Sequence, residues 1–169
     1  MRWLMGVMTG LALLQPGGVR ADPVQAMIDD MRATCDGAPL QEPDQRFHTL
    51  PLAEDGTEIL LFDQTEWDCP GMPGLFRHTG GGEVILRARL SPQALEARQA
   101  RGQDAPHDGV IHYRTSARGW QMIDLRGLPI LLLARHGSYC DGAGYMPCVE
   151  ALTWTDGMFL TVGSGDEGE

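Results

Sequence analysis

The sequence contains no lysine, and this absence bears on what the protein can bind. All 13 of its basic side chains are arginines, against 23 aspartates and glutamates. Eleven of the arginines and all of the acidic residues follow residue 21, which gives that part of the chain a net charge of −12. Nucleic acids and anionic membranes both require a basic surface, so both are excluded as partners. A cationic protein or a cationic component of the cell envelope fits this charge.

The sequence also lacks an apolar run long enough to cross a bilayer. The first apolar run covers residues 3–14. As a helix, this run is too short to cross a hydrocarbon core of about 30 Å. The run follows Met1-Arg2, precedes Gln15-Pro16, and leads to the small-residue end Val19-Arg20-Ala21. This layout is typical of a signal peptide cleaved after Ala21, with no cysteine next to take a lipid. We expect residues 1–21 to be that peptide and the mature protein to be periplasmic or secreted.

No Cys-x-x-Cys pair is present, which argues against a zinc site. The four cysteines predict two disulfides in an exported chain: Cys35, Cys69, Cys140 and Cys148. These four cysteines can pair in three ways. We favour Cys140–Cys148, which closes a short loop rich in glycine and proline, and therefore Cys35–Cys69, which ties an N-terminal helix to the rest of the domain.

Helical periodicity is clearest directly after residue 21. Asp22-Pro23 has the chemistry of an N-cap followed by a first helical residue. Apolar side chains recur on one helical face, namely Val24, Met27, Ile28, Met31 and Cys35. Gly37 and Pro39 predict the end of this helix.

The rest of the chain is dominated by short strand patterns. We predict strands over residues 47–52, 57–62, 83–90, 110–115, 119–125, 128–135, 149–154 and 158–162, with a polar surface helix starting at Ser91-Pro92. Pro51 makes the first of them an edge strand, and the apolar run 128–135 is a central strand with both faces covered at least partly. Tight turns between successive strands indicate an antiparallel meander. We therefore predict one secreted α+β domain over residues 22–162, an N-terminal helix packed on a mainly antiparallel β-meander braced by disulfides. We expect residues 163–169 to form a disordered acidic tail.

The loop at residues 136–148 has the highest density of side chains that could bind a ligand. It carries four polar or aromatic side chains that could contact a ligand: His136, Tyr139, Asp141 and Tyr145. A loop held by a disulfide on a rigid scaffold commonly binds partners, and tyrosine offers apolar area and a hydrogen bond at low entropic cost. The alternative is a purely structural loop whose tyrosine rings cover the end of the sheet.

The sequence contains no convincing motif for a catalytic site, a metal site or a cofactor site. His136-Gly137-Ser138 suggests a small hydrolase, but Ser138 lacks the G-x-S-x-G pattern and the strand-turn-helix context of a nucleophile elbow. The other histidines lack metal-binding spacing, and Asp55-Gly56 lacks the acidic positions of a calcium loop. Gly80-Gly81-Gly82 precedes a strand rather than a phosphate-binding helix. We predict no catalytic residue, no metal and no cofactor.

Several short motifs resemble small exported proteins of alphaproteobacteria that have no assigned activity. They span residues 47–162 and comprise Trp67-Asp68-Cys69, Gly119-Trp120, His136-Gly137-Ser138-Tyr139-Cys140, Cys148, Trp154 and Gly157-Met158-Phe159. Tyr145, Cys148 and Trp154 are also similar to the late strands of periplasmic lysozyme inhibitors, which are small disulfide-braced β-barrels. The lysine of those inhibitors has no counterpart here.

Together these observations predict a non-catalytic periplasmic binding or accessory protein. The alternatives are a small periplasmic hydrolase using His136 and Ser138, a lysozyme-inhibitor-like module, and a structural protein of the envelope.

Overall fold

The computed structural model describes residues 22–146 and 148–162, so the predicted signal peptide and acidic tail lie outside the described residues. Two four-stranded antiparallel sheets make up most of the fold. Sheet 1 has the order β1 (His48–Leu50), β2 (Glu58–Asp63), β3 (Gly82–Arg89) and β4 (Val110–Ala117). Sheet 2 has the order β5 (Gly119–Leu125), β6 (Leu128–Arg135), β7 (Cys148–Thr155) and β8 (Met158–Val162). The predicted α+β class with antiparallel strands is confirmed.

Each sheet is an antiparallel meander of consecutive strands, as predicted, but the eight strands do not form one continuous meander. β4 pairs with β3, whereas β5 pairs with β6, although only Arg118 separates β4 from β5. Ala117 is buried there, and the Arg118 N–H donates to the carbonyl of Ala134 at 2.7 Å, at the end of β6. The short connection that resembled a hairpin turn is instead a corner where the chain passes from one sheet to the other.

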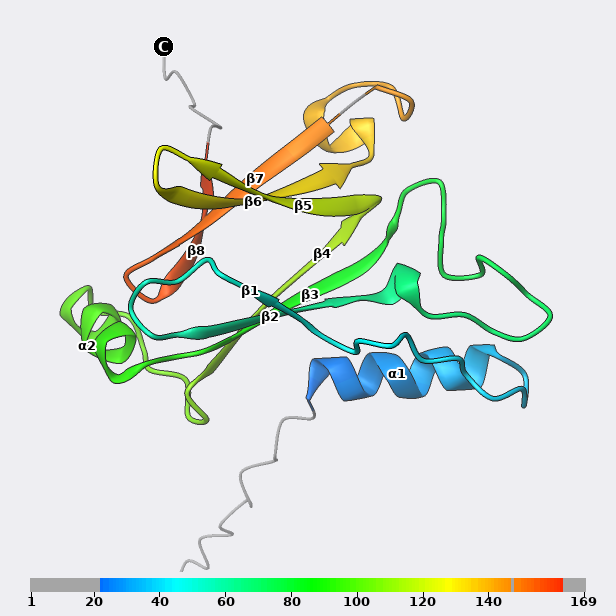
Figure 1. The fold of residues 1–169 in the computed structure, drawn as a ribbon, viewed down its shortest axis with the longest axis horizontal. Helices are drawn as coiled ribbons and strands as arrows, with labels where there is room; N and C mark the ends of the chain where they lie inside the picture. The colour runs from blue at the N-terminus through cyan, green and yellow to red at the C-terminus, as the bar shows by residue number, and fades with distance from the viewer. Residues whose placement is uncertain (1–21, 147, 163–169) are drawn as a thin grey trace, which may run out of the picture.

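The main core lies between the two sheets, which face each other in Figure 1. Strand alternation sends Leu61, Val84 and Leu86 of sheet 1 into this core, where they join Leu131, Leu133 and Leu152 of sheet 2. All six are at most 1% exposed. Burying apolar surface from both sheets is the main force that holds them together.

A second cluster surrounds the first helix, α1 (Pro23–Thr34). The side chain of Asp22 caps it by accepting the N–H of Val24 at 2.9 Å. All five residues of the predicted apolar face are buried, and they share a cluster with Phe62 and Ile85 on the opposite side of sheet 1 from the main core. Figure 1 shows α1 alongside sheet 1. The Cys35–Cys69 disulfide joins the end of this helix to the segment that follows β2, as predicted.

The second helix, α2 (Pro92–Ala100), lies at one end of the two sheets in Figure 1. Its contacts with the β7–β8 turn fix it there: Arg98 donates to the carbonyl of Gly157 at 2.9 Å, and Arg101 pairs with Asp156. Gly157 has a φ of +79°, and a Cβ there would lie 2.7 Å from the carbonyl of Ala94. Only glycine therefore suits this position.

Both predicted disulfides are present, which fits an oxidising, extracytoplasmic compartment. Within the described residues, no helix has the length and apolar character needed to span a membrane.

Candidate functional site

The loop between β6 and β7 is compact and braced, as its composition predicts. It contains one turn of 3-10 helix (Gly137–Cys140) and the Cys140–Cys148 disulfide, whose Cα atoms are 5.8 Å apart. Two further backbone bonds of 2.9 Å close it, from Gly142 to the carbonyl of Gly137 and from Met146 to the carbonyl of Ala143. The loop lies at the end of sheet 2 far from α2 (Figure 1).

The four predicted site residues are exposed or half-buried, but they do not converge on one point. Tyr145 is 88% exposed and Tyr139 is 57% exposed. The Arg135 guanidinium lies 3.9 Å from the ring centre of Tyr139 and supports it. Asp141 is exposed, with a left-handed φ of 55°. These positions fit a contact surface rather than an enclosed pocket.

His136 and Ser138 do interact, with 2.7 Å between Nδ1 and the serine hydroxyl. A catalytic triad also needs an acid on the other ring nitrogen. Among the described residues, no carboxylate lies within hydrogen-bonding distance of His136, and Gly144 packs against its ring. No group of three metal-binding side chains occurs within the described part of the chain either.

A feature not predicted from the sequence is the side of sheet 2 that faces away from sheet 1. Alternation and register define its members, and the rows Leu132–Ala151–Val162 and Thr153–Leu160 run across the strands. We call this surface the uncharged face: Gln121, Ile123, Leu125, Leu128, Ile130, Leu132, Ala134, Val149, Ala151, Thr153, Thr155, Met158, Leu160 and Val162. None of these residues is charged, in a chain with 36 charged side chains.

The exposed apolar side chains of the described residues are concentrated here. Eight of the nine large exposed hydrophobic residues belong to the uncharged face or to the β6–β7 loop; the ninth is Met72. Val149, 57% exposed, directly follows the loop and joins the two surfaces. The corresponding side of sheet 1 instead carries charges such as Glu83, Arg87 and Arg114. Contiguous apolar surface of this kind marks interaction sites.

A polar link between the sheets positions the loop next to this face. Tyr113 of β4 donates to Glu150 Oε1 of β7 at 2.6 Å, and Glu150 Oε2 pairs with Arg135 of β6. Burial, together with this hydrogen bond to the negative Glu150, raises the pKa of Tyr113 to about 12. Arg135 in turn supports Tyr139, so the core fixes the base of the loop.

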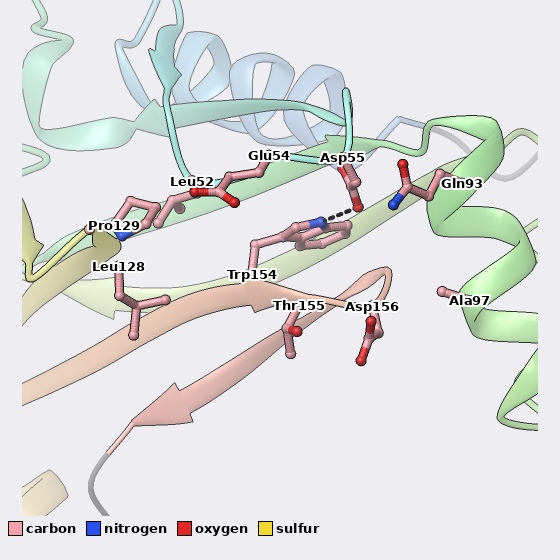
Figure 2. A pocket seen from close by; sticks show the side chains of 11 residues that line it. Leu52, Glu54, Asp55, Gln93, Ala97, Leu128, Pro129, Trp154, Thr155 and Asp156 are labelled. Carbon is pink, nitrogen blue, oxygen red and sulfur yellow. Dashed lines mark hydrogen bonds between the residues drawn. The ribbon is translucent and has the colours of Figure 1, made fainter.

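A pocket lies elsewhere, at the α2 end (Figure 2). Its volume is about 480 Å³, and its lining comes from the β1–β2 connection, α2, the β5–β6 turn and the β7–β8 turn. The Trp154 indole donates to Asp55 Oδ2 at 3.0 Å, and Asp55 Oδ1 accepts the Thr57 N–H at 2.8 Å. Burial alone would raise the pKa of Asp55, but these hydrogen bonds together lower it.

This pocket could not be found from the sequence, because four separate segments meet to form it. It contains neither His136 nor Ser138, and no histidine, serine or cysteine lines it. Trp154 is 6% exposed and belongs to the main core. The pocket therefore offers three carboxylates, those of Glu54, Asp55 and Asp156, but no histidine, serine or cysteine.

No known protein family, curated protein or solved structure matches this chain.

Proposed function

We propose that this protein is a non-catalytic binding module of the periplasm or the secreted fraction, and that the uncharged face and the β6–β7 loop dock a partner protein. One observation carries the proposal: among the described residues, eight of the nine large exposed hydrophobic side chains lie on this surface. An apolar centre with aromatic anchors is the usual anatomy of a protein interface.

The partner that fits is a basic protein. The chain after residue 21 has a net charge of −12, so the uncharged face is an apolar patch on an acidic molecule. Opposite charges around an apolar patch speed association and exclude acidic competitors. A lysozyme-inhibitor-like module, suggested by the similarity of Tyr145, Cys148 and Trp154, is one form of this function, and it makes lysozyme a defined first probe.

The hydrolase alternative draws support from the His136–Ser138 hydrogen bond. Binding is favoured over it because Ser138 does not line the pocket at the α2 end, and because no carboxylate among the described residues completes a triad with His136.

Three single variants of the mature protein test the proposal. Val149→Asp and Leu160→Asp each place a charge on the uncharged face, whereas Met72→Asp places one on an exposed hydrophobic residue elsewhere. Each is immobilised and used to capture proteins from a periplasmic extract, and each is titrated with lysozyme. We expect a basic protein to bind the wild type and Met72→Asp but neither of the other two. Equal capture by all four proteins, or capture of no basic protein, would contradict the proposal.

Self-association is a separate outcome of the same variants. Sedimentation equilibrium of the wild type should show a monomer. A dimer that Val149→Asp dissociates and Met72→Asp preserves would mean that a second copy of the chain, not a basic partner, covers the uncharged face.

A further inference from the structure

A small cavity of about 240 Å³ lies where the β2–β3 connection meets the corner between β4 and β5. Its lining residues are Thr65, Arg77, His78, Gly81 and Arg118. Two arginines and a histidine thus share one cavity, on a chain whose overall charge is strongly negative. Such a local excess of positive charge requires an explanation.

Backbone carbonyls hold both arginines in place. Arg77 donates from Nε to the carbonyl of Thr65 at 2.7 Å, and Arg118 donates from Nε to the carbonyl of Thr79 at 2.7 Å. Arg118 also donates from Nη2 to the carbonyl of Gly144 at 2.9 Å, in the β6–β7 loop. Neutral acceptors orient these guanidinium groups without cancelling their charge.

Among the residues that the structure describes, the remaining donors of these two arginines lack an acidic partner. Six of the other nine arginines between residues 22 and 162 form ion pairs with carboxylates. Within that described part of the chain, no carboxylate lies within 4.0 Å of Arg77 or Arg118. Both terminal nitrogens of Arg77 and Nη1 of Arg118 are therefore left to bind an anion.

Gly81 fixes the geometry of the cavity. Its φ is +97°, and a Cβ there would clash with the carbonyl of Ala117 and lie 2.7 Å from the backbone nitrogen of Arg118. A larger residue would displace the corner that carries Arg118, so the two sides of the cavity depend on this glycine. Because both arginines are already oriented, binding an anion would cost little additional ordering.

We propose that this cavity binds a phosphate group, either as free phosphate or as a small monoester. Guanidinium groups match the planar pairs of oxygens of such an anion and bind it by charge-assisted hydrogen bonds. His78 adds a ring nitrogen at the same cavity. A long polyanion such as a nucleic acid would be repelled by the acidic surface of the protein, whereas a small dianion contacts only the arginine-lined cavity. This site is separate from the uncharged face and does not depend on the function proposed for that face.

The test is a nuclear magnetic resonance titration of the mature protein with sodium phosphate, with sodium chloride at equal ionic strength as the reference. We expect saturable shifts of the amide signals of His78, Gly81 and Arg118 with phosphate alone. Phenyl phosphate in a second titration distinguishes the two sources, because tighter binding than phosphate assigns the site to a monoester, and weaker binding assigns it to the free ion. Shifts that fail to saturate, or that chloride reproduces, would overturn the proposal.

Three variants complete the test. Arg77→Gln and Arg118→Gln should each weaken phosphate binding by about tenfold or more, because each removes a charged donor. Arg77→Lys should weaken it less, because it keeps the charge and loses the paired donors. Arg126→Gln, in the β5–β6 turn, is the matched control and should bind as the wild type does. An equal loss in Arg126→Gln would show that only overall charge matters, and would overturn the proposal.

Discussion

The double variant Tyr139→Ala/Tyr145→Ala separates a binding loop from a structural one. Tyr145 is 88% exposed, so its truncation should change the free energy of unfolding by no more than about 0.5 kcal/mol, as for other surface positions. Tyr139 loses its contact with the Arg135 guanidinium, 3.9 Å away, and exposed contacts of this kind are worth about 0.5–1 kcal/mol. The double variant should therefore lose roughly 1 kcal/mol of stability in all.

Urea unfolding measures this loss, and the capture assay measures binding. Tyr113→Ala is the comparison variant, because Tyr113 packs against the main core and should cost about 3 kcal/mol as buried aromatics do. We expect the Tyr139/Tyr145 variant to stay folded and to lose the basic partner. A loss of 3 kcal/mol or more would refute the reasoning and make the loop structural, and normal stability with undiminished binding would remove the two tyrosines from the interface.

Three further predictions concern the core. Glu150→Gln leaves the Arg135 side chain, which is only 10% exposed, without its counter-charge, so the free energy of unfolding measured in urea should fall by about 3 kcal/mol. Adding Arg135→Met should recover part of this loss, because it removes the unpaired charge. The absence of any recovery would contradict the pairing. Because folding raises the pKa of Tyr113 from 10.0 to about 12, its stabilisation is complete below pH 10 and is lost between about pH 10 and 12. Tyr113→Phe should lack this alkaline loss in pH-dependent unfolding, and an unchanged pH profile would exclude Tyr113 as its source. Cys35→Ser opens a link across 34 residues and Cys140→Ser one across 8, so chain entropy predicts losses of about 3.8 and about 2.5 kcal/mol. The reverse order of melting temperatures would contradict that estimate.

Local patterns predicted the individual elements well, because they depend on periodicity and capping. The apolar spacing from Val24 to Cys35 matches the buried side of α1, and Asp22 caps it. The predicted strand at residues 128–135 coincides with β6, which is flanked by β5 and β7. The pairing of all four cysteines is also as favoured from loop length.

The division into two sheets could not be predicted, because it depends on which strands pair and not on where they lie. A short connection at Arg118 is compatible with a hairpin and with a corner, and only the burial of Ala117 between the sheets decides between them. The prediction for β6 is confirmed. Leu131 is fully buried, and on the opposite face Ile130 is 3% exposed and Leu132 is half-buried, so both faces are at least partly covered.

The candidate site was therefore predicted in part. The β6–β7 loop was found from composition alone, since tyrosines and a short disulfide stand out in the sequence. The uncharged face was missed because alternating apolar residues do not reveal which side of a sheet another layer covers. The arginine-lined cavity was missed because Arg77 and Arg118 are distant in sequence and meet only at the corner between the sheets.

The most direct test of the central claim is hydrogen–deuterium exchange of the mature protein with and without its captured basic partner. We expect the partner to slow amide exchange in β7, β8 and the described part of the β6–β7 loop. We expect α1 and sheet 1 to exchange as in the free protein. Protection confined to α1 or to the charged side of sheet 1 would contradict the central claim.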